Sequence, residues 1–266
     1  MMDEQKEIFF WEHIEELRKH IIHCFYAIAI STVILMNNKK IIFDYILFGP
    51  AKKNFITYRL LSLFTKKISF FIKPVFYLSD NLEIQNRKIF GQFNTYIWFC
   101  LMGGLILSSP YIFYEFWKFI KPALSAKEKK YSKGIIMFLS TLFFIGIFFG
   151  YFILFPFLIH FGFSFKISHF PKNIFDLSDY ISLMIHSVLS MGFLFLFPFF
   201  IFFFTKIGII SPIYLKKYRR YAFFIMLIIS SAITPGDILS TIIVMIPLMI
   251  LYQGSIYISY FFINSK

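Results

Sequence analysis

Three carboxylates lie close to the ends of long apolar runs, where two can meet a cationic ligand at a membrane surface and the third can contact a polar residue of a partner helix. Glu16 precedes the first run, Glu128 follows the second among basic residues, and Asp237 lies in the turn before the last. A carboxylate binds an arginine guanidinium through two parallel hydrogen bonds. Glu16 and Glu128 therefore suggest a site for a positively charged peptide. The alternatives are a solvated helix face for Glu16, a local ion pair for Glu128, and a turn or N-cap residue for Asp237.

No spacing typical of a catalytic or metal centre occurs in the sequence. It lacks a Ser-His-Asp order, an H-E-x-x-H pair and a phosphate-binding glycine loop. Its two cysteines, Cys24 and Cys100, form no C-x-x-C pair. We therefore expect no enzyme activity, no cofactor and no metal. The six histidines are interpreted as interfacial or packed residues that share no face and no ligand spacing: His13, His20, His23, His160, His169 and His186.

The composition is that of a protein that crosses a membrane several times. Of the 266 residues, 58% are hydrophobic and only 15% are charged, whereas soluble domains carry about 25% charged residues. The net charge of +13 lies mainly in the loops between apolar runs. That placement favours a role in topology and contact with anionic lipid over binding to nucleic acid.

The apolar runs predict an all-α membrane protein with six transmembrane helices in one domain over residues 1–266. Before the first run, residues 1–20 predict a short amphipathic helix at the interface. We expect the last two helices to be short. Residues 52–92 form an external insertion whose secondary structure the sequence leaves open. The predicted spans are 21–41, 93–116, 134–160, 180–205, 220–234 and 238–263.

The basic residues predict the orientation of these spans. An even number of spans places both termini on one side, together with the loops 115–133 and 206–220. Those two loops carry six and five basic residues, whereas the short loop 166–179 on the other side carries two. Short loops rich in Lys and Arg stay in the cytoplasm. Both termini are therefore expected to be cytoplasmic.

Charged side chains are nearly absent from the apolar runs themselves. A proton or ion relay needs such residues inside the membrane. A secondary transporter for a small solute or ion is also expected to show polar residues at mid-membrane and internal repeats. Several runs contain a proline but no repeat is visible. A transporter of this kind is the alternative to a peptide receptor.

Four motifs resemble the TatC family, the multispanning subunit of the twin-arginine protein translocase. HIEELR (His13–Arg18) resembles the family's H-x-x-E-L-R signature, and SPYIFYEFWKFIKPALSAKEK (Ser109–Lys129) is similar to its first cytoplasmic loop. Gly49-Pro50 and Thr234-Pro235-x-Asp237 resemble two further motifs. The likeness extends over about residues 9–262, with 52–92 longer than the loop expected there. The first two motifs together are highly specific.

This resemblance implies a glove-shaped (curved) bundle of six helices in the cell inner (plasma) membrane. It implies a receptor for signal peptides with two adjacent arginines, which exports folded cargo proteins using the proton-motive force. Single-span TatA and TatB proteins are the implied partners, with self-association. By motif match, the signal-peptide-binding residues are Glu16, Arg18, Phe119, Pro122, Leu124 and Glu128. The structural or coupling residues implied are Pro50, Pro110, Trp117 and Asp237.

One position departs from the family's pattern. The family usually has a polar residue, often Glu, two residues before a proline of the fourth span, whereas this chain has Leu196 before Pro198. A buried carboxylate is costly in a membrane, so its absence is easily tolerated. A mechanism that needs protonation at this position is not expected here. Gln253 in the sixth run is the nearest polar substitute.

Overall fold

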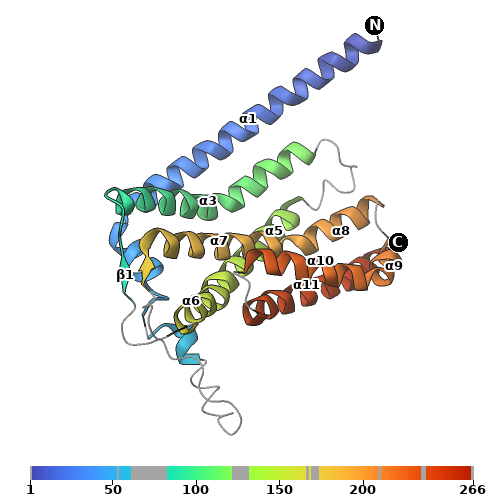
Figure 1. Ribbon diagram of the computed structural model, residues 1–266. Helices are drawn as coiled ribbons and strands as arrows, with labels where there is room; N and C mark the ends of the chain where they lie inside the picture. The colour runs from blue at the N-terminus through green and yellow to red at the C-terminus, as the bar shows by residue number, and fades with distance from the viewer. Residues whose placement is uncertain are drawn as a thin grey trace. The chain divides into compact units, whose positions relative to one another are not determined.

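The computed structural model is built almost entirely of helices (Figure 1). It describes residues 2–52, 54–60, 83–121, 132–165, 168, 174–208, 211–234 and 238–264. Five helical segments within these residues are long and apolar enough to cross a membrane: 13–37, 91–120, 134–164, 177–205 and 240–257.

The first helix, α1 (Met2–Asn37), is continuous over 36 residues. The N-terminal segment, for which the sequence predicts a short amphipathic helix at the interface, belongs to the same rod as the first span. The reason is local, because residues 2–37 contain neither glycine nor proline to break the helix. A π-helix, η1 (Ile41–Leu47), follows and ends before Gly49-Pro50.

Two further spans contain prolines whose freed carbonyls find side-chain donors. α3 (Gly91–Ile120) carries Pro110, which cannot donate to the carbonyl of Ile106; the Ser109 hydroxyl donates to it at 2.7 Å instead. The third span consists of α5 (Ser132–Phe149), the π-helix η3 (Gly150–Leu154) and α6 (Phe155–Ser164).

Pro156 explains the change of helix type in the third span. It leaves the carbonyl of Phe152 without an i+4 donor, and the Thr57 hydroxyl donates to that carbonyl. The backbone N–H of Phe155 bonds to Gly150, five residues back, which is the spacing of a π-helix.

The insertion 52–92 combines a helical turn at 56–60 with a short strand. That strand, β1 (Ile84–Gln85), pairs in parallel with β2 (Phe175–Asp176), with Ile84 opposite Phe175. The backbone N–H of Arg87 lies 3.5 Å from the Asp176 carboxylate, next to this pairing. The two-residue ladder thus joins the insertion to the start of the fourth span.

The fourth span is broken where a proline follows Leu196. α7 (Leu177–Phe195) ends at Leu196, and α8 (Phe197–Ile207) begins with Pro198 in its first turn. The remaining helices are α9 (Pro212–Lys217), α10 (Arg219–Ile233) and α11 (Ile238–Asn264).

The prediction that the last two helices are short is right for α10 and wrong for α11. α10 has 15 residues, about 22 Å at 1.5 Å per residue, against a hydrocarbon core of about 30 Å. α11 has 27 residues and runs through Pro247. The run from Ile238 stays apolar and contains no second proline, so nothing ends this helix early.

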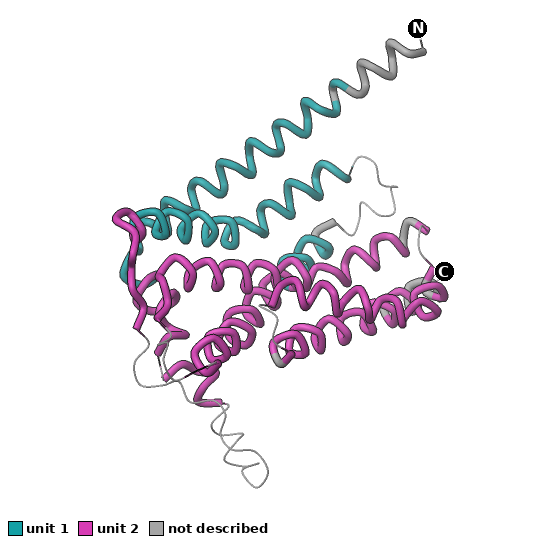
Figure 2. Tube along the Cα trace, in the orientation of Figure 1, with its two compact units in different colours: residues 1–42, 93–141 teal, residues 43–92, 142–266 magenta. Residues whose placement is uncertain are grey.

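The chain divides into two compact units (Figure 2). Unit 1 comprises residues 1–42 and 93–141, and unit 2 comprises residues 43–92 and 142–266. Unit 1 contains α1 and most of α3, and unit 2 contains the helices from η3 onward. The prediction of a single domain over 1–266 stays a prediction.

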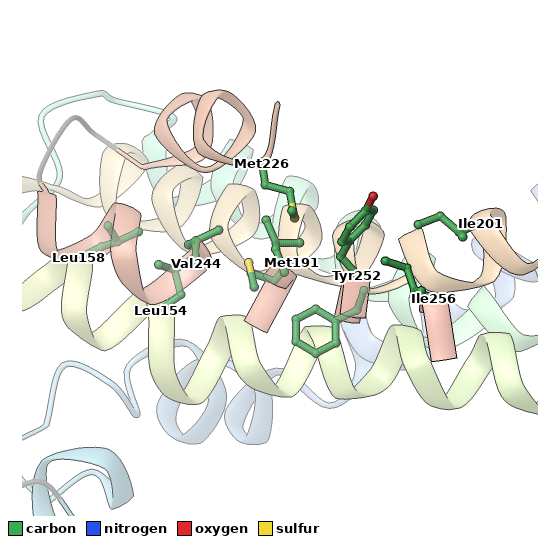
Figure 3. Close-up of a cluster of buried hydrophobic side chains, with 10 residues drawn as sticks. Leu154, Leu158, Met191, Ile201, Met226, Val244, Tyr252 and Ile256 are labelled. Carbon is green, nitrogen blue, oxygen red and sulfur yellow. The ribbon is translucent and has the colours of Figure 1, made fainter. Parts of the chain in front are cut away.

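Unit 2 is held by a cluster of buried apolar side chains from η3, α6, α7, α8, α10 and α11 (Figure 3). Met191, Val244 and Tyr252 are members of this cluster. In a membrane, close packing and small residues hold helices together, since lipid is as apolar as the core. Gly146 fits this rule, because a Cβ there would lie 2.5 Å from the carbonyl oxygen of Met191.

Candidate functional site

Close packing of α1 against α3 forms the frame of the site in unit 1. A Cβ at Gly104 would lie 2.3 Å from the Thr32 hydroxyl and 2.9 Å from the Thr32 backbone nitrogen. Further along, the Tyr96 hydroxyl donates to the Met36 carbonyl at 2.9 Å. The two helices therefore lie side by side (Figure 1).

Phe119 of α3 lies between two histidines of α1. The His13 ring stacks on it with centroids 4.5 Å apart, and the His20 ring meets it edge-on at 6.1 Å. Glu16 follows His13 by three residues and precedes His20 by four, so all three lie on one helix face. The structure therefore places Glu16 on the face of α1 whose histidines contact Phe119.

Glu16 is the acidic group of this face that is open to a ligand. Its side chain is 51% exposed, and the one ion pair recorded for it in the described part of the chain is a 4.0 Å contact with His13. Arg18 and Lys19 approach Glu15 instead, at 3.5 and 4.0 Å. These exposed pairs are worth little in stability, but they direct the neighbouring cations away from Glu16.

A second acidic residue of the site, Glu115, is buried and was missed in the sequence. Its carboxylate lies 2.5 Å from Nδ1 of His20, and the two residues are only 3% and 8% exposed. The sequence reading ended the second span near Glu115 and placed it in the loop. α3 continues to Ile120, so Glu115 lies inside an apolar helix. An acidic residue in such a helix needs a partner, and this need is the signal that could have identified Glu115.

The interpretation that the histidines share no face is wrong for two pairs on α1, His13 with His20 and His20 with His23. His20 and His23 are three residues apart on α1, and a ligand atom of each lies within 4.8 Å of the other and of Glu115. Two histidines and a carboxylate are a zinc-type ligand set. However, ligands about 2.1 Å from one metal at tetrahedral angles are about 3.4 Å apart. The 2.5 Å contact therefore describes a hydrogen-bonded pair.

Trp117 and Pro110 belong to the frame of α3. The Trp117 side chain is only 4% exposed, so it packs inside the protein and is not a surface aromatic. Pro110 lies ten residues before Ile120, the last residue of α3, beside buried Ser108 and Ser109. Both positions are consistent with the structural roles expected of them, which remain proposals.

Pro50 belongs to a segment of unit 2 whose carbonyls are bonded by three tyrosines. The Tyr58 hydroxyl donates to the Pro50 carbonyl at 3.1 Å. The carbonyls of Ile46 and Leu47, at the end of η1, accept from Tyr151 at 2.8 Å and from Tyr180 at 2.9 Å. Burial raises the pKa of Tyr58, which keeps this donor protonated.

The structure does not describe four of the predicted site residues: Pro122, Leu124, Glu128 and Asp237. Leu196 is buried, only 4% exposed, at the break between α7 and α8. The position where the family usually has a polar side chain is therefore apolar and packed here. The side-chain oxygen of Gln253 on α11 is buried, with no hydrogen-bond partner among the described residues.

The fold and this site together define an all-α protein that crosses the membrane several times. The family model for the Sec-independent protein translocase protein (TatC) matches residues 12–247. The chain belongs to this family. It is thus a translocase subunit of the twin-arginine type, and the alternative of a small-solute or ion transporter is not supported.

Individual proteins agree with this assignment. The chain is 66% identical over 266 residues to a TatC protein of Blattabacterium sp. subsp. Periplaneta americana (strain BPLAN), covering 100% of both chains. It is 33% identical over 196 residues to TatCy of Bacillus subtilis (strain 168), covering 71% of this chain and 77% of the relative.

A crystal structure of the twin arginine translocase receptor TatC in DDM superposes on this chain with a TM-score of 0.72. The two are 27% identical, and the match covers 93% of this chain and 99% of that one. The prediction of an all-α membrane protein with the six-span TatC fold is confirmed. α10, too short to count by length alone, is the additional span.

Proposed function

We propose that this translocase subunit is the receptor for signal peptides that carry two adjacent arginines. The observation that supports the proposal is the half-exposed Glu16 carboxylate on the face of α1 whose His13 stacks on Phe119, with its neighbouring cations paired to Glu15. A guanidinium group can bind this carboxylate through two hydrogen bonds. Glu128, from the loop after α3, is the proposed second carboxylate for the second arginine.

The remaining predicted residues receive supporting roles in this proposal. Arg18 supports the N-terminal segment by pairing with Glu15 and not with Glu16, while Phe119 offers an apolar ring beside the ligand. Pro122 and Leu124 shape the following loop. On the other side of the membrane, Pro50 and Asp237 serve as structural or coupling positions.

The proposal places the chain in the cell inner membrane with both termini in the cytoplasm. The basic loops support this orientation. Folded cargo proteins are then exported together with single-span TatA and TatB subunits, and the chain self-associates. The proton-motive force supplies the energy, in keeping with a sequence that has no phosphate-binding glycine loop.

A binding measurement tests the proposal. A fluorescent twin-arginine peptide is titrated against the purified protein in detergent and compared with a twin-lysine peptide. We expect Glu16→Gln to weaken binding about tenfold, since a hydrogen bond to a charged group is worth about 1.5–3 kcal/mol and this one is partly exposed. The lysine peptide should bind more weakly, because an ammonium cannot make the bidentate contact.

The matched control is Glu83→Gln, which removes the same charge from an exposed residue of unit 2. It should bind the peptide as the wild type does. Glu128→Gln should behave like Glu16→Gln. Equal affinities for Glu16→Gln and Glu83→Gln would reject Glu16 as a binding residue, and equal affinities for the two peptides would reject the arginine specificity.

A further inference from the structure

We propose that His20 and Glu115 form a positioning pair for the signal-peptide site, and that Glu115 does not itself contact the peptide. The pair holds α1 against α3 and so keeps Glu16 beside Phe119. This inference rests on the proposed function, since it concerns the residues that place the Glu16 carboxylate.

The geometry links the pair directly to the site. His20 makes two contacts with α3: its Nδ1 lies 2.5 Å from the Glu115 carboxylate, and its ring meets Phe119 edge-on at 6.1 Å. Glu115 and Phe119 are four residues apart on α3 and therefore lie on one face. On the opposite helix, His13 completes the set by stacking on the same Phe119 ring. One imidazole thus ties the carboxylate, the aromatic ring and the face of Glu16 together.

Burial separates the role of Glu115 from that of Glu16. Glu115 is 3% exposed, so its carboxylate is inaccessible to a peptide arginine, and it already bonds to His20. A buried carboxylate whose partner is removed remains uncompensated, which is strongly unfavourable. The nearby cations Arg18 and Lys19 contact Glu15 instead. His20 is therefore the partner on α1 that holds Glu115 in place.

Loss of the pair should then act on the peptide site at a distance of one helical turn. Glu115→Gln keeps the size of the side chain and removes its charge, and His20→Gln removes the imidazole. Each change loosens the contact of α1 with α3, so the Glu16 carboxylate is held in its binding position for a smaller fraction of the time. The peptide's apparent affinity falls by that fraction.

The experiment is a double-mutant cycle on twin-arginine peptide affinity with the full chain in detergent. We expect Glu115→Gln and His20→Gln each to weaken binding about tenfold, and the double variant to be no weaker than either, because contacting residues couple. His20→Arg, which can still donate to Glu115, should restore affinity to within about threefold of the wild type. A role of His20 that does not depend on its contact with Glu115 predicts no such rescue.

The matched control is His160→Gln. His160 on α6 is equally buried, at 7% exposure, and lies 3.3 Å from the Ser164 hydroxyl, but it belongs to unit 2. It should leave the peptide affinity unchanged while causing a comparable loss of thermal stability. Should either glutamine variant aggregate, the comparison of His20→Arg with His20→Asn decides the same point.

The outcomes separate this inference from the proposed function. If the wild type binds the peptide, Glu16→Gln weakens binding, and Glu115→Gln binds as the wild type does, the positioning pair is rejected and the receptor proposal stands. Additive effects of Glu115→Gln and His20→Gln would also reject the pair. If the wild type does not bind the peptide, the receptor proposal itself has failed.

Discussion

Replacing Gly104 by alanine should separate the two helices that carry the candidate site. A Cβ at this position would lie 2.3 Å from the hydroxyl oxygen of Thr32, 2.9 Å from its backbone nitrogen and 3.1 Å from the carbonyl oxygen of Ile28. The hydroxyl can rotate away after giving up its 2.8 Å hydrogen bond to Ile28. The two backbone atoms cannot, so α1 and α3 must move apart by several tenths of an ångström.

The magnitude follows from two opposing terms. Forcing an extra methyl group into a packed contact costs about 1–3 kcal/mol. Alanine in place of glycine favours a helix by about 1 kcal/mol, which offsets part of that cost. Gly254→Ala isolates the second term, because α11 carries Gly254 with no atom within 4 Å of the added Cβ. The difference between the two variants should therefore be about 1–3 kcal/mol.

The assay is denaturant unfolding in detergent, followed by twin-arginine peptide binding on the folded fraction. Gly104→Ala should unfold at lower denaturant than Gly254→Ala and bind the peptide more weakly. Adding Thr32→Ala should recover only part of the stability, since the backbone contacts remain. Equal midpoints for the two glycine variants would refute the close packing at Gly104, and full recovery by Thr32→Ala would refute the role of the backbone atoms.

Further predictions concern unit 2. Tyr180→Phe removes the donor to the Leu47 carbonyl and should cost about 1–3 kcal/mol in denaturant unfolding; an unchanged midpoint would contradict the bond. Thr57→Val leaves the Phe152 carbonyl without its hydroxyl donor and should lower the midpoint by a similar free energy, about 1–3 kcal/mol. Burial raises the pKa of Tyr58 in the folded state, so the contribution of Tyr58 to the free energy of unfolding is fully present below its unfolded pKa of about 10. This contribution is lost as the pH rises from there through the folded pKa, so the wild type should lose stability more steeply than Tyr58→Phe above about pH 10. Parallel curves of stability against pH for the two proteins would argue against the raised pKa.

Much of the fold could be predicted from local patterns. Apolar runs of about 20 residues mark spans whatever surrounds them, and the loop charges predict orientation in the same way. The breaks at Pro50, Pro156 and Pro198 follow from the missing N–H of proline. The motifs around Glu16 and Phe119 placed both residues near a membrane surface before any geometry was known. The predicted bounds of the last span, 238–263, nearly match those of α11, because a proline inside a membrane helix need not end it.

The partners of buried polar groups could not be predicted in this way. The pairing of His20 with Glu115 joins residues 95 positions apart, and the bonds of Tyr151 and Tyr180 to the end of η1 join residues 105 and 133 positions apart. Such contacts depend on which helix faces meet and at what register, and hydropathy says nothing of either. In an apolar medium each polar group must still find a donor or acceptor. The sequence by itself therefore determined that polar groups inside the spans need partners. Only the continuation of α3 to Ile120 and the packing of α1 on α3 decided that Glu115 is such a group and that His20 is its partner.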